Sequence, residues 1–104
     1  MSDSSPGERL RGLSSLVGNT PLLAIECEYR GARRVVHAKA EHLNLSGSIK
    51  DRMAMHILRH GYASGALRER ALIVEATSGN TGIAFASIGR ALGHSVTIFM
   101  PAWM

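Results

Sequence analysis

Hydrophobic and polar residues alternate along two early segments of the chain, and this alternation predicts two β-strands. The first segment is residues 22–29 and the second is residues 34–43. The residues between them, 30–33, are typical of a hairpin connection. Side chains of a strand point to opposite faces in turn. In the second strand we therefore expect one face toward a core and one away from it: Val36, Ala38 and Ala40 against Val35, His37, Lys39 and Glu41.

A helical spacing of apolar residues follows, and it predicts a helix over residues 49–60. Gly61 is a plausible C-terminal stop, because glycine readily adopts the left-handed conformation that ends many helices. The residues that define the apolar face of this helix are Ile49, Met53, Ile57 and Leu58.

The second half of the chain has the pattern of a βαβ unit. Residues 71–76 and 95–100 are short apolar runs, typical of buried strands. Between them, residues 83–92 are rich in alanine and are followed by Gly93, which predicts a helix. Strand, helix and strand with short links favour parallel pairing. We therefore predict an α/β fold: a β-hairpin, a lysine-bearing helix, and a βαβ unit of a parallel sheet. Residues 1–12 are expected to be a flexible lead-in.

Composition excludes several classes of partner. The chain has 104 residues, 45% of them hydrophobic, which suits one small domain. The net charge of +4 is scattered and aromatic residues are only 5%, so we expect no nucleic-acid partner. No apolar run approaches the length of a membrane span.

Cys27 has no partner for a disulfide, which favours a reducing, cytoplasmic location. His56 and His60 lack the glutamate of the zinc-protease motif, and we predict no metal site.

The polar stretch Leu45-Ser-Gly-Ser-Ile-Lys-Asp-Arg52 delivers one lysine to the start of the predicted helix. Ser48 is a favoured N-cap residue and Asp51 lies three positions later, which predicts a capping box with Lys50 at the second helical position. The positive end of the helix dipole disfavours a cation there by roughly 0.3–1 kcal/mol, and burial would act in the same direction. A neutral lysine amine forms Schiff bases with aldehydes. The alternative is a solvated lysine in an unfavourable position.

The stretch Thr77-Ser-Gly-Asn-Thr-Gly82 lies where a predicted parallel strand ends and a helix begins. Ligands of open α/β sheets bind in this crevice, and backbone N–H groups at a helix start attract anions. The glycines would let the backbone come close to a small carboxylate or a phosphate. The stretch matches neither a dinucleotide fingerprint nor a Walker loop. The alternative is an ordinary strand–helix link with capping residues.

Three stretches together resemble one family. Asn44-Leu-Ser-Gly-Ser-Ile-Lys-Asp-Arg52 resembles the Asn-Pro-x-x-Ser-Val-Lys-Asp-Arg signature of cysteine synthases, which are fold-type II, pyridoxal-phosphate-dependent enzymes. Glu75-Ala-Thr-Ser-Gly-Asn-Thr-Gly82 resembles their Glu-x-Thr-Ser-Gly-Asn-Thr-Gly loop, and Gly18-Asn-Thr-Pro-Leu22 their N-terminal motif. The resemblance covers residues 13–104, which it implies are part of a tryptophan synthase β-like domain.

The resemblance implies a role for each matching residue. Lys50 would form the Schiff base with pyridoxal phosphate and later remove the α-proton of an amino-acid substrate. Asn80 would hydrogen-bond the cofactor's 3′ oxygen. Four residues of the loop would bind the substrate carboxylate: Thr77, Ser78, Gly79 and Thr81. The implied reaction is β-replacement, such as the conversion of O-acetylserine and sulfide to cysteine, in a homodimer of the full-length parent.

The sequence also departs from the family pattern. Leu45 stands where the family has proline, and Gly47 adds a flexible point before the lysine. Family members are much longer, and no stretch here resembles their downstream Gly-Thr-Gly-Gly-Thr phosphate loop. We therefore expect a truncated N-terminal part that is inactive alone. Two alternatives stay open: another lyase of the same fold, performing β-elimination or resembling cystathionine β-synthase, and a non-catalytic remnant that pairs with an intact subunit. Dehydratase-like members tend to have phenylalanine before the lysine, so Ile49 favours the synthases.

Overall fold

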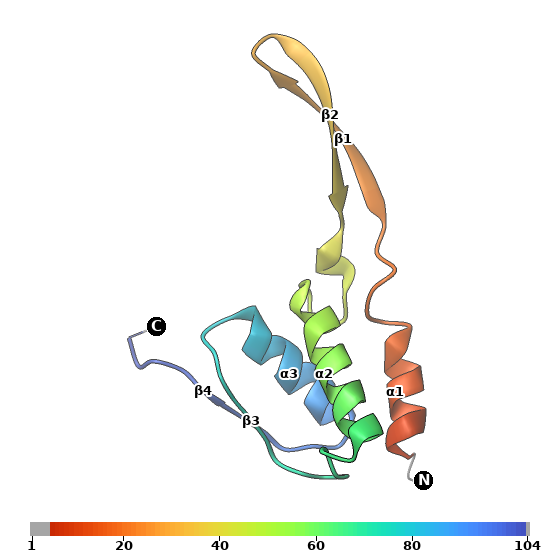
Figure 1. Ribbon diagram of the computed structural model, residues 1–104. Coiled ribbons are helices and arrows are strands. Elements are labelled where there is room, and N and C mark those ends of the chain that lie inside the picture. Colours follow the sequence, from red (N-terminus) through yellow and green to blue (C-terminus); the bar gives the residue numbers. More distant parts are fainter. Residues whose placement is uncertain (1–4, 104) are drawn as a thin grey trace.

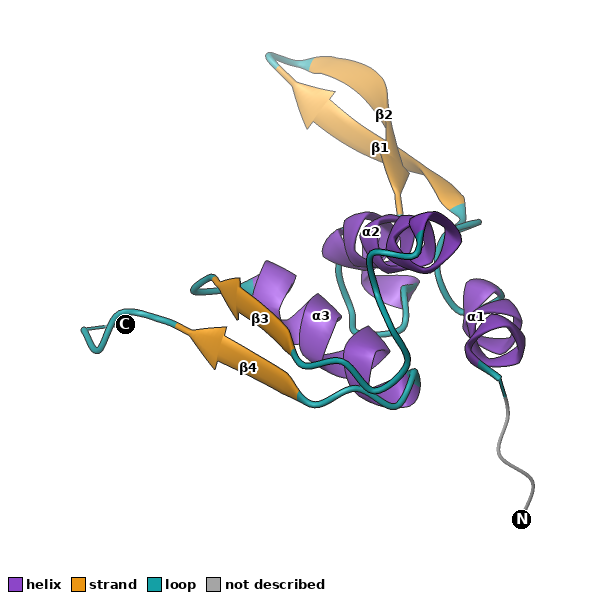
Figure 2. Ribbon diagram, turned by 60° about the horizontal axis from the view of Figure 1, so that its bottom comes forward, coloured by secondary structure: helices purple, strands orange, loops and turns teal. Residues whose placement is uncertain are grey.

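The predicted elements are present in the predicted order. The structure is a computed structural model that describes residues 5–103. Its elements are α1 (Pro6–Ser14), β1 (Leu22–Tyr29), β2 (Ala32–Lys39), the 3₁₀ turn η1 (Glu41–Leu43), α2 (Lys50–Ser64), β3 (Ile73–Ala76), α3 (Asn80–Ala91) and β4 (Val96–Phe99). The hairpin of β1 and β2 projects from a body in which α3 lies between α2 and the β3–β4 pair (Figures 1 and 2). The α/β class is confirmed.

A helix, α1, occupies much of the segment that we expected to be a flexible lead-in. Residues 6–12, which we assigned to a flexible lead-in, form most of α1. The Ser5 hydroxyl accepts a hydrogen bond from the Glu8 N–H (3.2 Å), and Pro6 occupies the first helical position, where its missing N–H costs nothing. Leu10 joins the hydrophobic core. Residues 1–4 of the expected lead-in lie outside the described residues.

The hairpin has the predicted strands but not the predicted burial. Its turn is Arg30-Gly31, with φ of 51° and 76°, as in the two-residue turns that suit twisted strands. Pairing of Ile25 with Val36 and of Leu23 with Ala38 creates one apolar face. We expected this face of β2 to contact a core, but Val36 is 51% exposed and the hairpin projects away from the helices (Figure 1). Ala40 is buried, but it lies beyond the end of β2.

Helix α2 begins and ends later than predicted. It continues past Gly61, which leaves room for Leu67: a Cβ on Gly61 would lie 2.9 Å from the Leu67 Cβ. The stop is instead Gly65, in the left-handed conformation at φ 79°. Of the four apolar residues that we expected to define its buried face, only Leu58 is buried. The buried positions of α2 are Asp51, Ala54, Met55 and Leu58, and the three apolar ones pack with Ala84, Phe85 and Ile88 of α3.

Strands β3 and β4 pair in parallel, as predicted, with Ile73 opposite Val96. Helix α3 covers one face of the pair, and Gly89 allows the close approach, since a Cβ there would lie 2.7 Å from Val96 Cγ2. The opposite face is not covered by the described residues, because Val74 and Phe99 are 54% and 61% exposed. The prediction of strands buried on both faces is therefore correct for one face only.

A buried histidine fastens the C-terminal half of α2 to the sheet. His94 is fully buried; its Nδ1–H donates to the Ala71 carbonyl (2.7 Å), so Nε2 accepts from the Tyr62 hydroxyl. Burial raises the pKa of the Tyr62 hydroxyl.

Among residues 5–103, no helix combines the length and the apolarity that a membrane span requires.

Candidate functional site

The two stretches with candidate chemistry lie at the same end of the molecule's central helix pair. Helices α2 and α3 pack against each other through their buried apolar faces. Both begin at the end nearer the hairpin, as their colours show in Figure 1. Lys50 is the first residue of α2, and Asn80 is the first residue of α3. The fold therefore places a lysine and a polar loop at two neighbouring helix starts.

Lys50 occupies the start of α2 without the predicted capping box. Ile49, in helical conformation (φ −61°, ψ −21°), takes the cap position with no side-chain hydrogen bond, so Lys50 is the first helical residue and not the second. The Lys50 N–H donates to the Ser48 hydroxyl (3.2 Å). The Lys50 side chain is exposed, so the described residues do not supply the burial that we considered. Its ammonium group makes no ion pair or hydrogen bond with residues 5–103.

The Asp51 carboxylate contacts Ser46, and the Asp51 N–H donates to the Ser48 carbonyl (3.4 Å) and not to its hydroxyl, so the capping box is absent. Asp51 is fully buried. Its Oδ2 accepts from the Ser46 N–H (2.5 Å), and its Oδ1 accepts from the Ser46 hydroxyl. The two contacts close a short loop over the intervening residues, in which Gly47 has φ 98°. The loop that presents the lysine is therefore held by the residue that follows the lysine.

Asn44 and Arg52 fix the two ends of the same loop. The Asn44 side chain is buried, accepts from the Gly18 N–H (2.7 Å) and donates to the Glu41 carbonyl (2.8 Å). The Arg52 Nε donates to both Glu41 carboxylate oxygens (2.9 and 3.2 Å). The hydrogen bond from Arg52 lowers the pKa of the Glu41 carboxyl. Burial opposes this effect, and a hydrogen bond from the Asn44 side chain lowers the pKa by a smaller amount. The sequence analysis assigned no role to Glu41, Asn44 or Ser46. The feature of the sequence that could have indicated them is their polar side chains close to the lysine.

The second loop leaves its donors open. It runs from the end of β3 into α3, where predicted. Gly79 caps α3 without a side-chain hydrogen bond. The backbone N–H groups of Ser78, Asn80 and Thr81 have no acceptor among residues 5–103. Gly82 is required by space, because a Cβ there would lie 2.9 Å from the Thr77 methyl group. Unpaired N–H groups at a helix start form a site for an anion.

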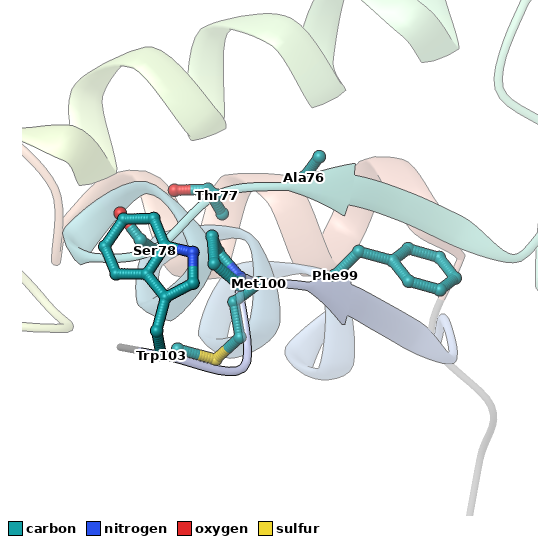
Figure 3. Close-up of a pocket in the computed structure, with 7 residues that line it drawn as sticks. Ala76, Thr77, Ser78, Phe99, Met100 and Trp103 are labelled. Carbon is teal, nitrogen blue, oxygen red and sulfur yellow. The ribbon is translucent and has the colours of Figure 1, made fainter.

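A hollow of about 520 Å³ adjoins this loop. Figure 3 shows the Thr77 and Ser78 side chains gathered with Met100 and Trp103 where β3 and β4 end, while Phe99 points away. The volume is within the usual range for small-molecule sites, about 300–1,000 Å³. Of the predicted loop residues, Thr77 and Ser78 line this hollow, whereas Gly79, Asn80 and Thr81 follow them in the chain and do not line it.

Known proteins are similar to most of this chain. The pyridoxal-phosphate dependent enzyme family matches residues 13–104. The chain belongs to this family. It is 40% identical over 90 residues to a cysteine synthase of Dictyostelium discoideum, covering 86% of this chain and 24% of that protein. It is 42% identical over 92 residues to a cystathionine beta-synthase of Saccharomyces cerevisiae, covering 86% of this chain and 18% of that protein.

Solved structures agree with the sequence relatives. A hydrogen sulfide-producing enzyme from Fusobacterium nucleatum superposes with a TM-score of 0.88 at 49% identity, over 94% of this chain and 29% of that one. The chain spans about a quarter of the length of the curated cysteine synthases that it matches. Membership of the pyridoxal-phosphate dependent family therefore rests on the sequence and the fold together.

The residues of the site fit pyridoxal phosphate. The cofactor requires an amine for its aldehyde, and Lys50 offers one that is exposed and engaged by no described residue. It also requires donors for anionic oxygens, and the start of α3 offers three unpaired N–H groups, an amide and hydroxyls. The residues present thus include a nucleophile and anion donors at neighbouring helix starts.

Proposed function

We propose that this chain is the N-terminal part of a fold-type II pyridoxal-phosphate-dependent enzyme that performs β-replacement on an amino acid, as cysteine synthases do. The observation that carries the proposal is the shared end of α2 and α3: an exposed lysine begins one helix and unpaired anion donors begin the other. The preferred reaction is the replacement of the acetoxy group of O-acetylserine by sulfide.

Each residue has a chemical task in this proposal. The Lys50 amine would hold the cofactor at its aldehyde group and would accept the substrate α-proton at Nζ. Asn80 would donate its amide hydrogen to the cofactor ring oxygen. Thr77, Ser78 and Thr81 hold the substrate carboxylate, and Gly79 allows it to approach the backbone. When bound, the cofactor supplies an electron sink for the carbanion left by proton removal.

A second reaction on the same site is cystathionine synthesis. The identity of 42% to a cystathionine beta-synthase supports it as well as the likeness to cysteine synthases supports the first.

The protein that contains this chain would be tested with O-acetylserine, serine and threonine, each with sulfide or homocysteine. Turnover of O-acetylserine with sulfide supports the first reaction, serine with homocysteine supports the second, and threonine alone contradicts both. We propose a cytoplasmic homodimer as the setting.

A cofactor titration tests the site in the chain itself. The purified chain is titrated with pyridoxal phosphate, read by visible absorbance, then reduced with borohydride and mapped by mass. The chain has two lysines, Lys39 and Lys50. Lys39 donates to the Thr20 carbonyl. We expect a saturable band with the label on Lys50, loss of this label in Lys50→Arg, and its retention in Lys39→Arg. Equal labelling of both lysines would contradict a preformed site.

A further inference from the structure

The residue that follows the lysine is buried and charged without a cationic partner. Asp51 has no solvent exposure. Among residues 5–103, the ion pairs join Arg33 to Glu26 and Arg52 to Glu41, so none involves Asp51. A buried carboxylate is costly unless hydrogen bonds compensate it. Its position therefore requires a specific explanation.

Two features stabilise the Asp51 carboxylate where it lies. It accepts hydrogen bonds from both the backbone N–H and the hydroxyl of Ser46, one on each oxygen. It also lies in the first turn of α2, where the helix dipole favours a negative charge. Hydrogen bonds to an ionised group are roughly twice as strong as neutral ones. The contact between Asp51 and Ser46 is therefore a firm link between the loop and the helix.

This link encloses the lysine. Ser46 lies four residues before Lys50, and Asp51 follows it directly, so the backbone of residues 46–51 forms a closed ring. Beyond the ring, Asn44 is tied to Gly18 and Arg52 to Glu41. The Lys50 backbone is thus fixed on both sides, although its side chain is exposed. A fixed backbone reduces the conformational entropy that the lysine loses when it reacts.

We propose that Asp51 is a positioning residue for Lys50: by closing the loop onto Ser46, it holds the lysine amine in the place where the cofactor aldehyde is captured. The inference rests on the proposed function of Lys50. Asp51 itself touches neither cofactor nor substrate in this proposal. It acts through the loop backbone, and its charge strengthens the closure.

The test compares labelling of the two lysines in the full chain. The variants are Asp51→Ala, which removes the closure, and Asp51→Asn, which keeps its shape and removes the charge. Glu28→Gln, which removes a charge from an exposed position on the hairpin, is the matched control. After reaction with pyridoxal phosphate and borohydride, the ratio of Lys50 to Lys39 labelling is measured by mass. Circular dichroism selects the variants that remain folded.

We expect the labelling ratio to fall about tenfold or more in Asp51→Ala, as when a hydrogen bond to a charged group is lost. It should fall several-fold in Asp51→Asn and stay unchanged in Glu28→Gln. A folded Asp51→Ala chain with an unchanged ratio would overturn the proposal. If Asp51→Ala does not fold, an unchanged ratio in Asp51→Asn overturns it instead.

Hydrogen exchange separates this inference from the proposed function. Peptides that cover residues 44–50 should exchange faster in the Asp51 variants than in the unchanged chain, with no cofactor present. Equal labelling of Lys39 and Lys50 in the chain without substitutions would contradict the proposed function. In that case the hydrogen-exchange result alone tests whether Asp51 closes the loop. Exchange that does not change in Asp51→Asn would reject the closure itself.

Discussion

The two helix starts that form the candidate site are built in opposite ways. At the start of α2, side chains of the protein satisfy the loop: Asp51 binds Ser46, and Asn44 binds Gly18. At the start of α3, backbone N–H groups at Ser78, Asn80 and Thr81 find no acceptor among the described residues. In the first loop the polar groups form internal hydrogen bonds that fix the loop conformation. In the second loop the backbone donors stay unpaired and are available to a ligand.

The difference corresponds to two chemical tasks. A nucleophile must arrive at one place, so the backbone that carries it benefits from internal hydrogen bonds that limit its motion. An anion site must offer donors that nothing else has satisfied. The same fold element, a helix N-terminus after a short loop, therefore serves either task according to the side chains around it. Substitutions at equivalent positions of the two loops can test this contrast.

The largest effect on stability is expected from the asparagine of the first loop, Asn44, compared with the asparagine of the second loop, Asn80. Asn44→Ala removes three hydrogen bonds of a buried side chain and leaves the Gly18 N–H unpaired. It should lower the free energy of unfolding by about 3 kcal/mol, at roughly 1 kcal/mol per bond. Asn80→Ala is the matched control and should change it by less than about 0.5 kcal/mol, as an exposed position does. Urea unfolding measures both, and equal losses would contradict the contrast.

The glycines of the two loops should respond to different replacements. A Cβ on Gly82 would crowd Thr77 and Ile98, so Gly82→Ala should cost about 2 kcal/mol, and the larger asparagine more. Gly47 has free space but a φ of 98°. Gly47→Ala should cost about 1 kcal/mol, and Gly47→Asn less, since asparagine tolerates this region better. At Gly82 alanine should therefore be less destabilising than asparagine, and at Gly47 asparagine less destabilising than alanine. Thermal unfolding of the four variants measures these two rankings, and the same ranking at both sites would contradict the prediction.

Acid should weaken the first loop through Glu41. Its pKa is lowered in the folded chain by the hydrogen bond from Arg52, so its contribution is complete above the ordinary value of 4.5 and is lost as the pH falls through the lower folded value. Glu41→Gln should therefore lower the thermal midpoint at neutral pH, and this deficit should shrink below pH 4.5. Glu28→Gln is the control on the exposed hairpin. A deficit that grows in acid would have the wrong sign.

The smallest effect on stability should accompany a clear effect on binding. Asn80→Ala leaves the fold intact in the first prediction, but it removes the amide that we assign to the cofactor ring oxygen. The midpoint of the pyridoxal phosphate titration should therefore rise by about fivefold to tenfold, as for one lost hydrogen bond. Thr97→Ala, at an exposed position on β4, is the control. Unchanged affinity in Asn80→Ala would remove Asn80 from the site.

The sequence predicted the elements of the fold because their signals are local. Alternation indicated β1 and β2, an alanine-rich run indicated α3, and short apolar runs indicated the parallel strands. The errors concern which surfaces meet. Helical spacing selected Met53 and Ile57 as buried, yet α3 packs instead on the face of Ala54 and Met55, because tertiary contacts decide which face of a helix is covered. In the same way, alternation in β2 identified an apolar face but could not say what would cover it.

The places of the candidate site residues in the fold were predicted, but the hydrogen bonds that hold the lysine loop were not. The lysine and the polar loop follow from their places at helix starts, and their roles follow from the family resemblance. Asp51 was assigned to a capping box with Ser48, whereas its carboxylate reaches back to Ser46. Both partners are polar, close in sequence and sterically possible, so spacing alone does not choose between them. The choice depends on Gly47, whose positive φ turns the loop back toward the helix.

The hydrogen bonds around Lys50 also set an order of assembly during synthesis. The hydrogen bonds that residues 5–103 make to hold its loop join residues between Leu16 and Arg52, whereas the anion loop requires the chain to continue through β4. A ribosome releases about 5–20 residues per second. The polypeptide that contains all partners of the lysine loop thus emerges seconds before the strand that completes the second loop. The nascent chain can acquire its nucleophile first and its anion receptor afterwards.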